Sequence, residues 1–291
     1  MKTILLSIFS IFLMSCGHKQ SDNQDYILNS AKSQKAVLIL FPCFPCNKEH
    51  TETEAVFLKE MDKIGITTIL LDYNQKLFLT EIEKLELSEY LNQILDENKI
   101  EKENIFIGGF SSGGNVAALI TNYLLETQNE IKPKGVFIVD APFDLEELYK
   151  SAKKDLVKNA DLDAVEEANF LIQHLEKELG NPVEEIDNYI KNSPYLISRN
   201  SIQNISQLTK IKTRLYCEPA LDWQAENRTR VYEDLNAFKL EKTYESMIES
   251  GAKNVEFIET QNLGVRSNGQ NHPHSWNIVM REDLVKWILE N

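Results

Sequence analysis

A serine between two glycines is the residue of this sequence best placed for covalent chemistry. Residues 109–113 read Gly-Phe-Ser-Ser-Gly, the pattern G-x-S-x-G centred on Ser111. An apolar run at 105–107 precedes the pattern, and a helix-like run follows it. A strand that turns sharply into a helix strains its middle residue, and Gly109 and Gly113 leave room for such a turn. The order of strand, turn and helix predicts a nucleophilic serine, and a glycine-rich turn without chemistry is the alternative.

Two histidines near the C-terminus are candidates for the base that this nucleophile needs. A serine hydroxyl attacks a carbonyl only when a base takes its proton and a carboxylate orients that base. Of the five histidines in the chain, His272 and His274 lie between the last expected strand and the last expected helix. A loop there can reach the strand end that carries the serine. We choose His274, which lies nearer the helix, and keep His272 as the alternative.

The carboxylate is expected after a strand that lies between the serine and the histidine in the chain. Asp222 follows the expected strand 213–217, and we prefer it to Glu218, which is too close to the strand end. Asp140 and Asp144 follow the preceding strand and are weaker candidates. Any of these acids could instead cap a helix or close a turn.

Backbone N–H groups near the serine are expected to hold the oxyanion that acyl transfer creates. The N–H of Ser112, at the expected start of a helix, is the first donor. A second donor must come from the segment 42–46, which reads Pro-Cys-Phe-Pro-Cys and follows the expected strand 36–41. Because proline has no N–H, only Cys43, Phe44 or Cys46 could supply this donor, and we expect Cys43 or Phe44 from their positions.

The same segment contains the pattern C-x-x-C, formed by Cys43 and Cys46. Outside the cytoplasm such a pair can form a disulfide. A redox-active pair is the alternative, although a thioredoxin-like site needs its first cysteine at the start of a helix in a smaller domain than this one. Cys217 stands alone in the sequence.

Short apolar runs alternate with longer amphipathic runs from residue 34 onwards, which implies βαβ units in an α/β fold. Continuous apolar strands indicate a mostly parallel sheet with helices on both faces. The strands are expected at 36–41, 67–72, 104–110, 135–140, 213–217 and 254–258. Helices are expected between them at 53–64, 79–98, 115–125 and 235–251, and a closing helix after the last strand at 278–289.

The alternation is interrupted at about 145–210, where the sequence is acidic and helical in period. An insertion between two strands of a parallel sheet would lie over their carboxyl ends. We expect a helical cap that shapes a substrate pocket, and a solvated helical decoration is the alternative.

The N-terminus has the profile of an export signal. One lysine precedes the apolar run 4–14, which is too short to cross a bilayer comfortably. Residues 13–17 read Leu-Met-Ser-Cys-Gly and resemble the lipobox of bacterial lipoproteins. The resemblance implies that residues 1–15 are a signal peptide and that acylated Cys16 anchors the protein to a bacterial membrane, facing the periplasm or the exterior. The polar segment 16–33 is expected to be a tether. An ordinary secretory signal or an uncleaved anchor is the alternative.

Composition limits the class of partner. The chain of 291 residues has 45 acidic and 31 basic residues and a formal charge of −14. Because nucleic-acid binding needs a basic face, we do not expect a nucleic acid as partner. A hydrophobic fraction of 42% is that of an ordinary globular domain with a large core.

Residues from about 35 to 291 resemble the α/β-hydrolase superfamily, most specifically at the elbow around Ser111. The resemblance implies an α/β-hydrolase domain at 34–291 in which Ser111, Asp222 and His274 form a catalytic triad. It also implies a serine hydrolase that cleaves an ester, a thioester or a small amide of a small molecule or short peptide, without a metal or a cofactor.

One departure from the superfamily motivates two alternative functions. Many esterases of this superfamily carry a His-Gly-Gly-Gly loop where this chain has residues 42–46. A hydrolase-like lipoprotein that binds a ligand without turnover is therefore one alternative. A thiol oxidoreductase that uses Cys43 and Cys46 is the other.

Overall fold

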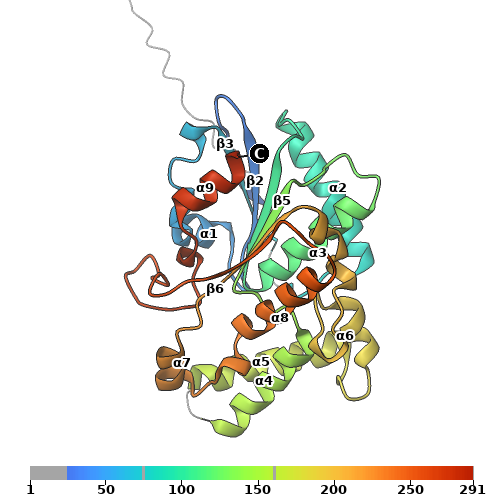
Figure 1. Ribbon diagram of the computed structural model, residues 1–291, viewed down its shortest axis with the longest axis vertical. Coiled ribbons are helices and arrows are strands. Elements are labelled where there is room, and N and C mark those ends of the chain that lie inside the picture. Colours follow the sequence, from blue (N-terminus) through green and yellow to red (C-terminus); the bar gives the residue numbers. More distant parts are fainter. Residues whose placement is uncertain (1–24, 74–75, 160–161, 291) are drawn as a thin grey trace, which may run out of the picture.

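The apolar runs of the sequence form a seven-stranded sheet at the centre of the molecule (Figure 1). The computed structural model describes residues 25–73, 76–159 and 162–290. Neighbouring strands follow the order β1-β3-β2-β4-β5-β6-β7, and all six pairings are parallel except that of β1 with β3. The strands are β1 Tyr26–Asn29, β2 Ala36–Phe41, β3 Ile66–Leu71, β4 Ile105–Phe110, β5 Gly135–Val139, β6 Lys212–Cys217 and β7 Val255–Glu259.

Helices cover both faces of this sheet, as continuous apolar strands require. Successive side chains of a strand point to opposite faces, so Val37 and Ile39 of β2 belong to one apolar core and Leu38 to the other. The first core also contains side chains of α2 (Glu81–Glu97), α3 (Ser112–Glu126) and α8 (Asn236–Glu249), and the second those of α9 (Arg281–Leu289). The predicted α/β class, a mostly parallel sheet between helical layers, is confirmed.

The first helix begins earlier than the amphipathic pattern predicts. The side chain of Asn47 accepts a hydrogen bond from the backbone N–H of His50, at 2.9 Å, and so caps α1 (Lys48–Glu54). Two short 3-10 turns follow, at Val56–Leu58 and Asp62–Ile64. The predicted single helix at 53–64 is therefore divided into three pieces.

The predicted tether needs correction at its C-terminal part. Residues Tyr26–Asn29 form β1, which pairs antiparallel with β3 at the edge of the sheet. The Tyr26 ring is buried, and its hydroxyl accepts a hydrogen bond from the side chain of Asn98 at 2.7 Å. The domain thus includes residues that the sequence-based division at 34 excluded. The predicted signal peptide, Cys16 and the residues before 25 lie outside the described ranges.

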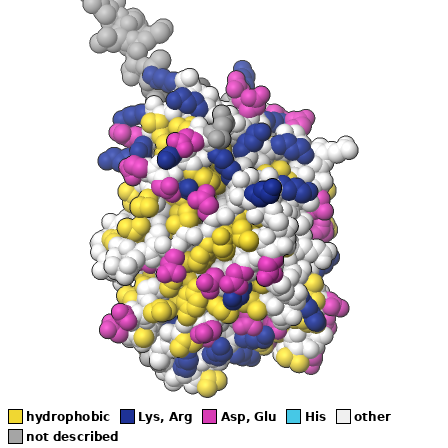
Figure 2. Space-filling view, viewed as in Figure 1, with side chains coloured by type: hydrophobic (Ala, Val, Ile, Leu, Met, Phe, Trp, Pro, Cys, Tyr) yellow, Lys and Arg dark blue, Asp and Glu magenta, His cyan; other side chains and the backbone are white. Residues whose placement is uncertain are grey.

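Helical segments occupy the predicted insertion between β5 and β6. They are α4 (Leu145–Lys158), α5 (Leu162–Leu179) and α6 (Ile186–Asn192), followed by 3-10 turns at Ile197–Arg199 and Gln203–Lys210. In Figure 1, α4 and α5 lie below one end of the sheet. No helix within the described ranges is both long enough and apolar enough to cross a bilayer. On the face drawn in Figure 2, basic side chains are interspersed with acidic ones, and apolar side chains lie between them.

Candidate active site

The elbow around Ser111 has the strained backbone that its sequence predicts. Ser111 lies between β4 and α3 with φ 55° and ψ −127°, a conformation that L-residues rarely adopt. Its backbone N–H donates to Val139 O at 2.8 Å, and its carbonyl accepts from Gly114 N at 2.9 Å. A Cβ atom on Gly109 would overlap the backbone of Gly113. The glycines are therefore required by space, and the serine side chain lines a cavity.

His274 lies at this elbow and is oriented by Asp140. The imidazole Nδ1 donates to Asp140 Oδ2 at 2.6 Å, which leaves Nε2 available to a hydroxyl. The two side chains are 32% and 13% exposed. The ring also packs on Phe110, the residue before the serine, with centroids 4.5 Å apart. The sequence-based choice of His274 over His272 agrees with this geometry.

The structure corrects the choice of the carboxylate. Asp222 lies exposed in the first turn of α7 (Leu221–Arg228) and has no hydrogen bond to His274 among the described residues. Asp140, which the sequence ranked lower, immediately follows β5 with φ 44°, and its N–H donates to Tyr216 O at 2.8 Å. The reason is sheet order: β5 adjoins β4, so its carboxyl end meets the elbow, whereas β6 is one strand further away.

The other two acidic candidates bind backbone rather than a histidine. Asp144 caps α4 by accepting from Glu147 N at 2.9 Å, and it also accepts from Ile197 N at 2.8 Å. Burial raises the pKa of Asp144 to about 6. Asp144 thus joins the start of α4 to the end of the cap.

Glu218 holds the loop that leads to the histidine. Its buried carboxylate accepts from Thr260 Oγ1 at 3.0 Å, from Leu263 N at 2.9 Å and from Gly264 N at 3.1 Å. A buried carboxylate needs such donors, since its charge would otherwise be unsolvated. Glu218 lies close to the end of β6, as its sequence position indicates, and this proximity lets its carboxylate reach the loop.

His272 lies beside the site without a carboxylate partner among the described residues. Its Nδ1 is 3.2 Å from both the backbone N and the backbone O of His274, and its ring packs against Trp223 with centroids 4.8 Å apart. Burial lowers the pKa of His272 to about 4, and the positive charge of Arg266 contributes to the same shift. His272 is therefore neutral at neutral pH.

Two residues that line the cavity with Ser111 have backbone N–H groups that could bind an oxyanion. Ser112 is the first residue of α3, and its N–H has no acceptor among the described residues. The same is true of the N–H of Phe44, which lines the cavity with Ser112, whereas Cys43 does not. A Cβ atom on Gly113 would overlap Pro42 O, which shows how closely this loop packs on the elbow. Of the two predicted second donors, Phe44 is better placed.

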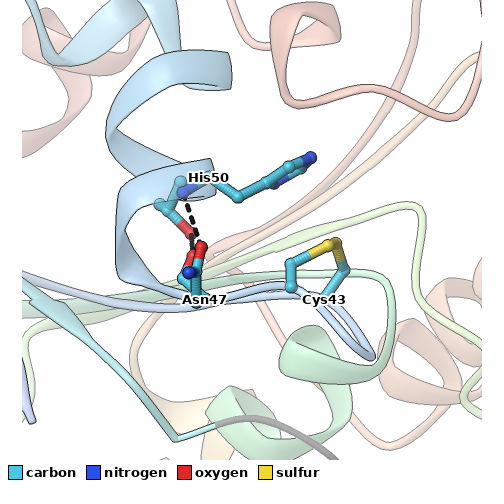
Figure 3. Close-up of a disulfide and its surroundings, with 5 residues drawn as sticks. Cys43, Asn47 and His50 are labelled. Carbon is cyan, nitrogen blue, oxygen red and sulfur yellow. Dashed lines mark hydrogen bonds between the residues drawn. A yellow bond between two sulfur atoms is a disulfide. The ribbon is translucent and has the colours of Figure 1, made fainter.

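A disulfide joins the residues on either side of this loop. Cys43 and Cys46 are bonded, and both precede the residue that caps α1, as Figure 3 shows. His50 lies nearby, and its ring and the two sulfur atoms could approach a common ion, since they lie within 4.8 Å of one another. Disulfide sulfurs are not thiolates, however, and cannot supply the ligands that zinc prefers. The bridge therefore acts as a constraint on Phe44.

We expect the doubly substituted Cys43→Ser, Cys46→Ser variant to lose about tenfold in kcat with little change in KM. The physical reason is that an oxyanion donor acts only when it is held in place, and loss of one donor altogether costs about 10²–10³-fold in kcat. Steady-state hydrolysis of a chromogenic ester, compared with wild type before and after thiol reduction, measures this effect. An unchanged kcat in both reduced and substituted protein would show that the bridge does not position the donor.

The cavity that contains these residues has a volume of about 710 Å³ and is roofed by the insertion. Phe44 packs against Phe170 and His174 of α5, with ring centroids 4.9 Å and 5.7 Å apart. Leu148 of α4 also lines the cavity. The insertion thus contacts the loop 42–46, which contains Phe44, and this contact supports the predicted role of the insertion in shaping a pocket.

In the described part of the chain, Ser111 Oγ donates no hydrogen bond to the ring of His274. Both side chains line the same cavity. In sites without substrate, catalytic hydrogen bonds are often long and tighten on binding. The structure thus brings a serine, a histidine and the carboxylate that binds this histidine to one cavity.

Comparisons with known proteins identify the fold. No model of a protein family matches the chain, and no curated protein matches it in sequence. One of two fungal esterases from Rhizomucor miehei is 12% identical, with a TM-score of 0.58 over 90% of this chain and 76% of that one. MPT51 (FbpC1) of Mycobacterium tuberculosis is 13% identical, with a TM-score of 0.55 over 90% and 92%. An esterase of the bacterial hormone-sensitive lipase family is 11% identical, with a TM-score of 0.54 over 91% and 79%.

These neighbours and the strand order show that the chain has the α/β-hydrolase fold. At such low identity the likeness concerns the fold alone. What the protein does must therefore be argued from its own site.

Proposed function

We propose that the protein is a serine hydrolase that cleaves an ester, a thioester or a small amide. The observation that carries the proposal is the His274–Asp140 hydrogen bond of 2.6 Å beside a serine with a strained backbone. A chance glycine-rich turn would need neither the strain nor an oriented imidazole. The carboxylate, the base and the nucleophile all line one cavity.

The reaction would begin with attack of Ser111 Oγ on the substrate carbonyl. His274 Nε2 takes the hydroxyl proton and then gives it to the leaving group, while Asp140 holds the ring and stabilises its positive charge. The N–H groups of Ser112 and Phe44 stabilise the tetrahedral oxyanion. Water, deprotonated by the same imidazole, then attacks the acyl-enzyme and releases the acid.

A fluorophosphonate probe is expected to label wild-type protein at Ser111 and to leave the Ser111→Ala variant unlabelled. The probe reacts only with a serine whose proton is removed by a neighbouring base. Ser112→Ala is the matched control, because it keeps the backbone N–H and is expected to be labelled like wild type. The measurement is mass spectrometry of the labelled peptide. Absence of labelling in folded wild-type protein would contradict the proposed serine hydrolase function.

The alternative of a non-catalytic binding protein is favoured by one observation, the missing contact between Ser111 and His274 in the described structure. The labelling experiment separates the two functions, since a binding protein would bind ligand and yet fail to react with the probe. The disulfide gives no comparable support to the oxidoreductase, because its sulfurs lie in a loop that packs on the elbow.

We further propose that Cys16 is acylated and tethers the domain to a bacterial membrane. The support is the resemblance of residues 13–17 to a lipobox. We expect wild-type protein, produced in a bacterium, to partition into the detergent phase of a phase-separating detergent, and Cys16→Ala to stay in the aqueous phase. Two acyl chains give stable anchoring, whereas one chain binds only marginally. Equal partitioning of both proteins would contradict the tether.

A further inference from the structure

Arg266 is held in a fixed position on the loop that carries the histidine. Its backbone N–H donates to Gln270 O at 2.9 Å, and its carbonyl accepts from Gly269 N at 2.8 Å. The next residue, Ser267, donates from its N–H and its hydroxyl to the carboxylate of Glu54, at 2.9 Å and 2.5 Å. A bridge between Val265 and Asn271 closes the hairpin. The origin of the Arg266 side chain is therefore fixed before any ligand arrives.

The guanidinium of Arg266 differs from the other partly buried arginines in its lack of a partner. It makes no ion pair and no hydrogen bond among the described residues. By contrast, Arg214 binds Asp283 at 2.6 Å, and Arg230 binds Asp155 at 2.5 Å. Arg266 is only partly exposed and lines the cavity that contains the triad, as well as a neighbouring surface hollow. A guanidinium in such a place offers a fork of donors to an anion.

The positive charge of Arg266 acts on the site itself. It contributes to the low pKa of His272, which lies on the same loop as His274 and packs on Trp223. Arg266 is therefore close enough for its field to reach the cavity. Because the imidazole of His272 is neutral, it adds no positive charge of its own to that of Arg266.

Most acidic groups of the cavity are already occupied. Asp155 binds Arg230, and Asp234 binds Lys154 at 2.7 Å. Asp140 binds His274, and the carboxylates of Asp144 and Glu218 accept backbone N–H groups. The remaining lining acids, Glu166 and Glu167, lie on the exposed side of α5, where water screens their charge. The positive charge of Arg266 contributes to the lowered pKa of Glu54, but the Glu54 carboxylate accepts its hydrogen bonds from Ser267.

We propose that Arg266 binds a carboxylate on the substrate, so that the enzyme acts on esters that carry a free carboxylate near the scissile bond. This inference rests on the proposed hydrolase function and names its substrate class. The planar fork of arginine fits a carboxylate with two parallel hydrogen bonds. In a protein of charge −14, an arginine without an ion pair among the described residues, in the cavity that Ser111 also lines, attracts an anion against the general repulsion.

Two matched pairs of chromogenic or simple aryl esters test this inference. Mono-4-nitrophenyl glutarate and 4-nitrophenyl pentanoate differ by a charge on the acyl side. The acetate esters 4-acetoxybenzoate and methyl 4-acetoxybenzoate differ by a charge on the leaving group. For at least one pair, we expect wild type to prefer the anionic ester by about tenfold or more in kcat/KM, the factor that one charge-assisted hydrogen bond supplies.

The variant Arg266→Gln is expected to lose that preference, with kcat/KM for the neutral ester unchanged. Arg266→Lys keeps the charge without the fork and is expected to retain part of the preference. Arg281→Gln is the matched control, because Arg281 lies on the neighbouring hollow and donates to Lys59 O instead of lining the triad cavity. Added salt should weaken the preference of wild type only.

Three outcomes would overturn the inference: equal charge preference in wild type and Arg266→Gln, an equal loss on both members of a pair, or a preference of wild type for the neutral esters. In each of these cases wild type still hydrolyses esters and is labelled at Ser111, so the proposed function stands. Failure of the proposed function is a different result, in which folded wild type hydrolyses neither pair and resists the fluorophosphonate probe.

Discussion

Replacement of Asp140 by asparagine is expected to lower kcat by about 10³–10⁴-fold while the protein stays folded. The carboxylate accepts the Nδ1 proton of His274 at 2.6 Å and so holds the tautomer that leaves Nε2 free to act as base. An asparagine amide can present its N–H₂ to the ring instead, which favours the wrong tautomer. Steady-state hydrolysis of a neutral aryl ester, with circular dichroism to verify folding, measures the effect.

The matched control for this substitution is Asp222→Asn. Asp222 is exposed in α7 and does not contact the histidine, so its amide variant is expected to retain activity within about twofold of wild type, since surface substitutions seldom have larger effects. Comparison of the two variants thus shows whether activity depends on Asp140, which the order of strands places at the elbow, or on Asp222, which the sequence predicts. A large loss in Asp222→Asn together with an active Asp140→Asn would show that the site is assembled differently in solution.

Replacement of Gly109 by alanine is expected to destabilise the protein by about 3 kcal/mol or more and to abolish labelling of Ser111. A Cβ atom at this position would overlap the backbone of Gly113, at the first turn of α3, where neither segment can move without breaking the elbow. Urea denaturation and the fluorophosphonate probe measure the two effects. Backbone atoms, unlike the end of a flexible side chain, cannot yield to the added methyl group.

Gly251→Ala is a control that separates the steric cost of an added Cβ atom from the cost of an unfavourable backbone conformation. Gly251 has φ +90°, but no atom lies within 4 Å of the place where its Cβ would be. Its alanine variant is expected to cost about 1 kcal/mol, from the left-handed backbone alone, and to leave labelling unchanged. If Gly109→Ala were as stable and as reactive as Gly251→Ala, the elbow would not require the glycine for space.

Local sequence was sufficient to predict the strained turn at Ser111 and to choose His274, the histidine that binds a carboxylate at the site. The elbow depends on residues within a few positions of Ser111, because only a strand, two small residues and a helix start are needed to form it. The choice of His274 rested on a loop between two recognisable elements. The succession of apolar and amphipathic runs likewise predicted the class of fold, since each run reports the burial of its own residues.

Pairing between distant segments was beyond the reach of the sequence. The strand β1 is only four residues long, and its antiparallel partner lies about 40 positions further along the chain, so Tyr26–Asn29 looked like the end of a tether. Choosing between Cys43 and Phe44 as oxyanion donor required the packing of their loop on Gly113.

The carboxylate shows most clearly what only the tertiary structure decided. Both Asp140 and Asp222 follow strands in the right chain order, so sequence alone could not separate them. Asp140 is selected because β5 is hydrogen-bonded directly to β4. The residue after β5 therefore lies at the elbow, where Asp140 Oδ2 is 2.6 Å from His274 Nδ1. By itself, the sequence singled out Ser111 and His274, which the fold brings to one cavity. The lateral order of strands, set by hydrogen bonds between segments far apart in the chain, decided which acid completes the site.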